Sequence, residues 1–259
     1  MPLVNRRVLL GALPLLFGAA RQGAADEPGV PLFTATYELR WHSLVAGYST
    51  LTLSQVSPGT YDYSSVNRAR GLFRLAFPDA IRERSEFRIV HGHVEPLMYE
   101  EDNGAGKASQ DVHLSFDWST RRASGTAAGK TVDQPLERGT QDPLSVQVEL
   151  MRDLIAGEAP THFLLFDKNS AQEYQYTRER TETLDTPLGR LDTVIYRSDR
   201  PDSDRVMRLW LAPSLGYLPV QAERRRKGKV EFELRIRKLQ RRGAAAQNPQ
   251  PPARGGASP

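Results

Sequence analysis

Apolar and polar residues alternate along most of this sequence, and one helical segment interrupts the alternation. The period of two appears in residues 32–42, 50–54, 81–89, 112–118, 174–177 and 230–239. Successive side chains of a strand point to opposite sides, so this period is typical of strands with one buried face. The sequence therefore predicts a mainly β protein.

The predicted helix covers about residues 142–156. Asp142 can accept a backbone N–H as N-cap, Pro143 has the φ of a first helical residue, and Gly157 signals the end. Its apolar positions recur every three or four residues: Leu144, Val148, Leu150, Met151, Leu154 and Ile155. This broad apolar face needs a partner, which must be the sheet.

About ten strands are too many for a flat sheet with comfortably open edges, so we expect the sheet to curl. The expected fold class is all-β: a curled antiparallel sheet, a barrel or half-barrel, with one principal helix that covers or lines its concave side. Residues 71–78 suit either a short helical turn or a lip over the sheet and stay unassigned.

The first 25 residues have the layout of a secretory signal peptide. Arg6 and Arg7 precede an apolar run at residues 8–20, and small residues follow. We expect cleavage after Ala25, or alternatively after Ala20, and export to the periplasm by the Sec or the twin-arginine route. The chain has no cysteine, so neither a disulfide framework nor a lipoprotein anchor is expected.

The remaining chain is expected to hold one β-rich domain at residues 26–242 and a disordered tail at residues 243–259, which lacks large apolar residues. No transmembrane segment is expected in the mature chain. Loss of the three arginines of the signal lowers the formal net charge from +4 to +1, so the composition does not indicate binding to nucleic acid.

Several short motifs occur in a recognisable order. They are QDPLS at 141–145, TPLG at 186–189, LWLAP at 209–213, YLPV at 217–220, and Trp41 followed by Ala46 and Gly47. Over roughly residues 32–239 the chain resembles the bacterial exported proteins grouped as domain of unknown function 3108. The resemblance implies an exported, β-rich domain without an assigned role. In architecture alone the chain is also similar to periplasmic lipoprotein carriers.

The concave side of the sheet is the expected ligand site. A curled sheet of about ten strands encloses more apolar surface than one helix of about four turns covers, so we expect a pocket for an acyl chain or a similar hydrophobic ligand. The residues placed toward it are Tyr37, Leu39, Trp41, Leu114, Phe116, Leu150 and Trp210. The alternative is a barrel filled by its own side chains.

The sequence carries no familiar catalytic or phosphate-binding motif: no Gly-x-Ser-x-Gly, no His-Glu-x-x-His and no phosphate-cradling glycine loop. We expect a non-enzymatic envelope protein that needs no cofactor and whose partner is a lipid-like ligand or an envelope protein. The alternatives are a scaffold or interaction module and an uncharacterised hydrolase, because catalytic groups can assemble in space.

Two sets of polar residues are candidate sites. His91 and His93 could share a metal ion with His113 or Glu95, but a polar hairpin turn is favoured, so no metal is expected. Residues 224–229 are basic and could touch an anionic lipid or glycan; the tip of a hairpin is the favoured reading.

The polar residues at the start of the predicted helix are a third candidate site. Asp142 and Ser145 could form a catalytic pair. A helix cap, in which Ser145 supplements Asp142, is favoured because both residues stand where capping side chains are common.

Overall fold

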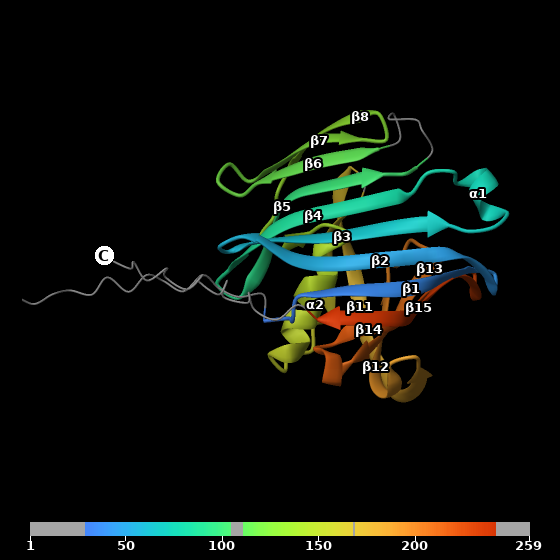
Figure 1. Ribbon diagram of the computed structural model, residues 1–259. Helices are drawn as coiled ribbons and strands as arrows, with labels where there is room; N and C mark the ends of the chain where they lie inside the picture. The colour runs from blue at the N-terminus through green and yellow to red at the C-terminus, as the bar shows by residue number, and fades with distance from the viewer. Residues whose placement is uncertain (1–28, 105–110, 168, 242–259) are drawn as a thin grey trace, which may run out of the picture.

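The computed structural model describes residues 29–104, 111–167 and 169–241 (Figure 1). The first eight strands are β1 (Phe33–Trp41), β2 (Leu44–Ser57), β3 (Thr60–Ala69), β4 (Ile81–Val90), β5 (His93–Asp102), β6 (Val112–Asp117), β7 (Arg122–Ala127) and β8 (Lys130–Pro135). The remaining strands are β9 (Thr140–Gln141), β10 (His162–Asp167), β11 (Ser170–Thr186), β12 (Gly189–Asp199), β13 (Arg205–Ala212), β14 (Leu218–Arg226) and β15 (Lys229–Arg241). The helices are α1 (Phe73–Ala76), α2 (Ser145–Ile155) and the 3₁₀ turn η2 (Pro213–Leu215).

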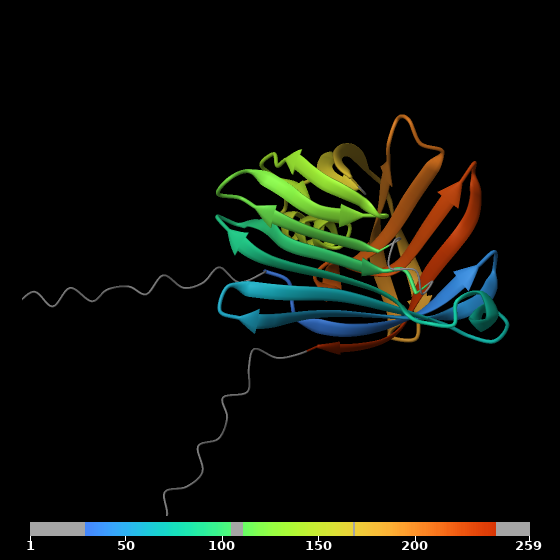
Figure 2. The ribbon, with the colours of Figure 1, turned by 90° about the horizontal axis from the view of Figure 1, so that it is seen from above.

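All of these strands belong to one sheet, whose order is β8-β7-β6-β5-β4-β3-β2-β1-β15-β14-β13-β12-β11-β10-β9. Neighbours are antiparallel except β9 and β10, which are parallel. The pairing of β1 with β15 joins the two halves of the chain, and Figure 2 shows the blue and red strands meeting there. The predicted fold class, a curled antiparallel sheet with one principal helix, is confirmed.

The described residues form fifteen strands, more than the predicted ten or so. The additional strands include β7 and β8, in a region where the sequence has few large apolar groups. Their buried positions are Ala123, Ala127 and Val132, so small side chains carry most of the alternation. A periodicity of small residues is a weak signal, which is why these strands were missed.

Side chains, rather than a continuous ladder of hydrogen bonds, bring the far ends of the sheet together. The Gln141 side-chain amide on β9 donates to the Val94 carbonyl on β5 over 2.8 Å. Phe116 on β6 and Phe166 on β10 form an edge-to-face contact with ring centroids 5.8 Å apart. The curled sheet is thereby closed around its concave side.

Helix α2 lies in that concave side and is buried on two faces. Val148 and Met151 belong to the cluster that includes most strands of the first half. Val146, Leu150 and Leu154 pack instead with side chains of β10 to β13. The helix therefore fills the space between the two halves of the sheet.

The N-terminus of α2 is capped as the sequence predicts. The Asp142 carboxylate accepts the backbone N–H groups of Leu144 and Ser145, each over 2.8 Å, and the Ser145 hydroxyl accepts the Asp142 N–H over 2.9 Å. The first helical hydrogen bond runs from the Val146 N–H to the Asp142 carbonyl. Asp142 is thus the N-cap by hydrogen bonding, although the regular helix begins at Ser145.

The unassigned residues 71–78 contain the single turn α1, which connects β3 to β4. The predicted signal peptide and the predicted C-terminal tail lie outside the described residues. Among the described residues, no helix has the length and apolar character needed to cross a membrane.

Candidate functional site

Four of the residues predicted to line a pocket are instead part of the filled interior. Tyr37, Leu114, Phe116 and Leu150 are each at most 4% exposed. The Tyr37 hydroxyl donates to the Pro219 carbonyl over 2.8 Å, so even its polar atom is satisfied inside the protein. Because α2 occupies the concave side, the middle of the curl is filled by the protein's own side chains, which was the alternative to a central pocket.

Trp210 is likewise buried, at 5% exposed, in the same core cluster as Tyr37 and Leu114. Its neighbours on β13, Leu209 and Leu211, pack with Leu150 of α2. The Trp210 Nε1 is 3.4 Å from a carboxylate oxygen of Glu182. Trp210 therefore contributes to the filled interior, and both sides of the end of β13 are buried.

The last two predicted residues, Leu39 and Trp41, line a pocket at one end of the sheet. Its volume is about 220 Å³, and its lining residues come from α1 and its flanks and from β1 to β4, β14 and β15. The lining is mainly apolar: Leu39, Trp41, Ala46, Ala69, Phe73, Phe77, Ile81 and Phe232, with Asn67, Asp79 and Arg224. Two larger hollows, of about 480 and 670 Å³, have mostly polar or charged linings and suit an apolar ligand less well.

Strand pairing explains how this pocket forms. Trp41 is opposite Phe232, and Leu39 is opposite Leu234, across the β1–β15 pair. Phe73, in the turn after β3, lines the same pocket as Trp41 and Phe232. Phe232 could have been found from the alternation of the last strand, whereas Phe73 and Phe77 were missed because residues 71–78 gave no clear period.

One arginine stands beside the aromatic groups. The guanidinium carbon of Arg224 is 5.5 Å from the centre of the Phe232 ring, and its Nε is 3.2 Å from a carboxylate oxygen of Glu231. The Arg224 side chain is 40% exposed. The basic stretch at residues 224–229 contains the turn between β14 and β15, as predicted, yet its first residue also lines the pocket.

Large apolar side chains are exposed near the same end of the sheet. Leu72 and Leu75, which flank and belong to α1, are 83% and 85% exposed. Leu44, at the start of β2, is 65% exposed, and Trp41 is 39% exposed. Grouped exposed apolar residues often mark a surface that binds something.

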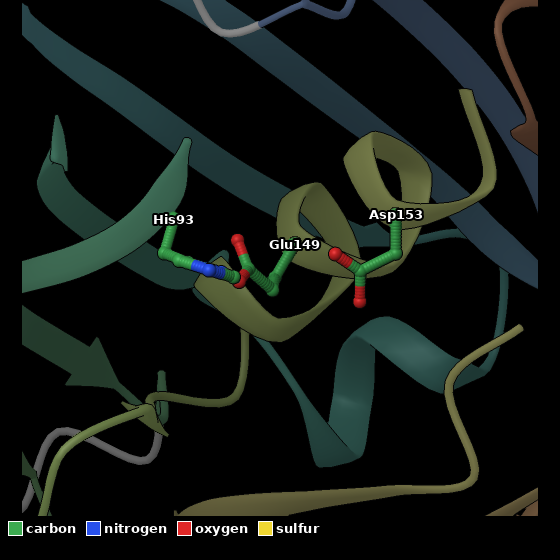
Figure 3. Close-up of side chains that lie close together, drawn as sticks. All are labelled: His93, Glu149 and Asp153. Atoms are coloured by element: carbon green, nitrogen blue, oxygen red, sulfur yellow. The ribbon is translucent and has the colours of Figure 1, made fainter. Parts of the chain in front are cut away.

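A second cluster of functional side chains lies between β5 and α2 (Figure 3). The His93 Nδ1 is 2.8 Å from one Glu149 oxygen, and the other Glu149 oxygen accepts the Val94 N–H over 2.8 Å. Asp153 stands one helical turn further along α2. The ligand atoms of His93, Glu149 and Asp153 all lie within 4.8 Å of one another.

The electrostatics of this cluster follow from burial and proximity. The hydrogen bond with Glu149 raises the pKa of His93. Burial, followed by the repulsion of Glu149 and Glu158, raises the pKa of Asp153 to about 7. The cluster therefore brings two carboxylates close together beside one histidine.

His93 does not meet the residues that the sequence suggested as its partners in a metal site, His113 and Glu95. Glu95 pairs with Arg88 over 2.8 Å, and His113 is 3.6 Å from Glu100. Neither residue belongs to the cluster of His93, Glu149 and Asp153. The acidic residues that do meet His93 come from α2. Their spacing of four residues on a predicted helix was the available signal, but their meeting with β5 depends on the fold.

The alternative pairing of Asp142 and Ser145 as catalytic groups has no support in the geometry. Both side chains hydrogen-bond the backbone at the start of α2 and are fully buried. Burial raises the pKa of Asp142 to about 6 against the opposing effect of its hydrogen bonds, of which that from Ser85 is the strongest. These residues act as a helix cap.

Comparison with known proteins agrees with this architecture. No curated protein matches the sequence. The crystal structure of a β-barrel-like protein of domain of unknown function DUF1849 from Brucella abortus is similar, with a TM-score of 0.54 and 12% identity over 83% of this chain and 99% of that chain. The crystal structure of MucB is more distant, with a TM-score of 0.36 and 11% identity over 86% of this chain and 58% of that chain.

These structural likenesses concern the fold alone, because the identities are low. The sequence itself carries stronger information: the model of the family described as protein of unknown function (DUF3108) matches residues 36–235. This range includes the pocket beside α1, helix α2 and nearly the whole sheet. The chain belongs to the DUF3108 family of proteins of unknown function.

Proposed function

We propose that this protein binds one apolar chain of an anionic amphiphile in the pocket beside α1. The observation that carries the proposal is the lining, in which Trp41, Phe73, Phe77 and Phe232 surround a cavity that the protein's own side chains leave open. Ligand pockets are typically apolar and aromatic with a few polar groups that set orientation. The site thus lies at one end of the concave side rather than at its centre.

The size of the pocket supports a narrow ligand. Its volume of about 220 Å³ is below the range of about 300–1,000 Å³ that is usual for pockets of drug-sized ligands. A single acyl chain, or part of one, suits this volume better than a fused-ring compound. The remainder of a longer amphiphile would lie against the exposed Leu72 and Leu75.

The charge beside the pocket supports an anionic head group. Arg224 lies over Phe232 at the pocket wall and is still 40% exposed, so it can reach a carboxylate or phosphate outside the apolar lining. Asp79 also lines the pocket and disfavours a second negative charge on its own side. The head group is therefore expected on the Arg224 side.

Tryptophan fluorescence tests this proposal directly. Detergent-free protein is titrated with decanoate, and a saturable shift in emission is expected because Trp41 lines the pocket. The Trp41→Phe variant keeps Trp118 and Trp210 and should lose the shift. A wild-type protein that shows no saturable change, or a variant that shifts equally, would contradict the proposal.

A pair of size-increasing variants provides the matched control. Ala69→Phe fills the pocket and should abolish decanoate binding, as measured by native mass spectrometry. Val66→Phe, on the same strand but with its side chain directed to the other face, should bind as the wild type does. Equal binding by both variants would place the ligand elsewhere.

We also propose that the protein is exported and works in the cell envelope. The arrangement of basic, apolar and small residues at positions 1–25 supports this location. Intact-mass measurement of protein from the envelope fraction tests it, and a mature chain that begins near Asp26 is expected. A chain that retains Met1 would contradict export with cleavage.

A further inference from the structure

We propose that His93, Glu149 and Asp153 bind one first-row divalent transition-metal ion, with Zn²⁺ as the test ion. This inference is independent of the proposed amphiphile site. The three residues lie where β5 begins, whereas the pocket lies where β4 begins, and β4 and β5 are joined by a tight turn at His91 and Gly92. The two sites are thus at opposite ends of the same strand pair.

The fold places the three side chains together. Glu149 and Asp153 are four residues apart on α2, which puts them on one face of the helix. His93 is the first residue of β5, directly after the turn. Figure 3 shows Glu149 between His93 and Asp153, and the ligand atoms all lie within 4.8 Å of one another.

The donor set selects the kind of ion. One imidazole nitrogen with two carboxylate oxygens suits Zn²⁺ and related transition metals, while Ca²⁺ and Mg²⁺ favour oxygen ligands alone. Three protein ligands also leave a position for water, as in many zinc sites with an open position.

Only small movements are needed to admit an ion. With metal–ligand bonds of about 2.0–2.2 Å, tetrahedral coordination separates two ligand atoms by about 3.3 Å. The His93 Nδ1 and Glu149 Oε1 are now 2.8 Å apart, so this pair must open slightly while Asp153 turns inward. The His93 side chain is 66% exposed, so little packed protein opposes that movement.

The surroundings already orient the central ligand. The Val94 N–H holds one Glu149 oxygen, and the Val94 carbonyl is itself held by the Gln141 side chain over 2.8 Å. Arg152 donates to the Gly92 carbonyl over 2.9 Å, which fixes the turn that carries His93. Outer hydrogen bonds of this type commonly position metal ligands.

A simpler role for these residues is an ion pair between His93 and Glu149 that fastens the turn to α2. That role requires neither Asp153 nor a metal ion. The two readings therefore predict different responses to Zn²⁺ and to a change at Asp153.

The experiment measures Zn²⁺ binding to the full chain by equilibrium dialysis with metal analysis, together with the melting temperature. We expect one Zn²⁺ per chain, a higher melting temperature with Zn²⁺, and binding weakened about tenfold or more in His93→Gln and in Asp153→Asn. The control is His113→Gln, which removes a histidine that also lies near a glutamate but, among the described residues, belongs to no group of three possible ligands. It should bind Zn²⁺ as the wild type does.

Two results would overturn the metal site. One is a wild-type protein that binds no Zn²⁺ at millimolar concentration, or that binds it equally in all variants. The other is a His93→Gln variant whose melting temperature falls by the same amount with and without Zn²⁺ while Asp153→Asn behaves as the wild type. That second pattern would identify the ion pair as the whole role of the cluster.

Discussion

The Ser85 hydroxyl donates a hydrogen bond of 2.5 Å to the Asp142 carboxylate, across 57 positions of sequence. Both side chains are fully buried. Ser85 lies on the concave face of β4, opposite Tyr63 on one neighbouring strand and Tyr99 on the other. The bond therefore connects the cap of α2 to the middle of the sheet through the buried, titratable carboxylate of Asp142.

Replacement of Asp142 should change how the free energy of unfolding depends on pH. The folded pKa of Asp142 is raised to about 6 from 3.8, so the native state binds the proton more tightly than the unfolded chain. Its contribution to the free energy of unfolding therefore falls by about 3 kcal/mol as pH rises from about 4 to about 6. Asp142→Asn can keep both capping bonds and should lack this fall. Urea denaturation at several pH values measures the difference between the two proteins.

The control for the Asp142 prediction is Ser85→Ala. The hydrogen bond from Ser85 lowers the Asp142 pKa, so its removal should raise that pKa further. The fall in stability should then extend to higher pH than in the wild type. Stability curves for Asp142→Asn and the wild type that run parallel between pH 4 and 7 would contradict the assignment.

The contact between Phe116 and Phe166 should be energetically coupled, because it closes the two ends of the sheet on each other. A double-mutant cycle with Phe116→Leu and Phe166→Leu is expected to give a coupling of about 0.5–1.5 kcal/mol. Chemical denaturation of the four proteins measures it. Strictly additive effects would mean that the two strands do not meet in solution.

Gly47 should tolerate no side chain. An added Cβ would lie 2.1 Å from the Arg68 carbonyl oxygen, and backbone cannot move aside as a side chain can. Gly47→Ala is expected to lower the free energy of unfolding by about 1–3 kcal/mol. Ser49→Ala on the same strand is the control, because among the described residues its buried hydroxyl has no hydrogen-bond partner. The control should leave stability unchanged or slightly higher.

Arg224→Gln should weaken binding of a charged amphiphile more than binding of a neutral one. Because the side chain is 40% exposed, solvent screens its charge, and we expect a loss of about 0.5–1 kcal/mol, or roughly two- to fivefold in affinity. Calorimetry with decanoate and with the matching neutral monoglyceride makes the comparison. An equal loss for both ligands would show that Arg224 acts by packing alone.

The start of α2 shows what local sequence can predict. The Asp142 carboxylate accepts the N–H groups of Leu144 and Ser145, and the Ser145 hydroxyl accepts the Asp142 N–H, so the cap forms from neighbours in sequence. The strands with large apolar residues follow in the same way from their period of two. The strands β7 and β8 have the same period, but their buried residues are mostly small. Their alternation is therefore weakly hydrophobic, and the sequence did not predict them.

The pocket shows what local sequence leaves open. Leu39 and Trp41 were predicted to face the hollow, yet so were Tyr37 and Trp210, and nothing in their own segments separates the two pairs. The difference is what stands opposite each side chain after folding. Tyr37 meets the Pro219 carbonyl in the interior, whereas Trp41 meets Phe232 at an end of the sheet where space remains.

The sequence by itself determined the strands that carry large apolar residues, the position where the one long helix begins, and the need to bury its apolar faces. Those properties depend on hydrogen bonds and side-chain directions within a few residues. Only the tertiary structure decided that α2 fills the centre of the curl, that the open pocket lies beside α1, and that His93 meets Glu149. Burial and polar contacts of this kind depend on residues that are distant in sequence, and their positions are set only when the whole sheet has paired.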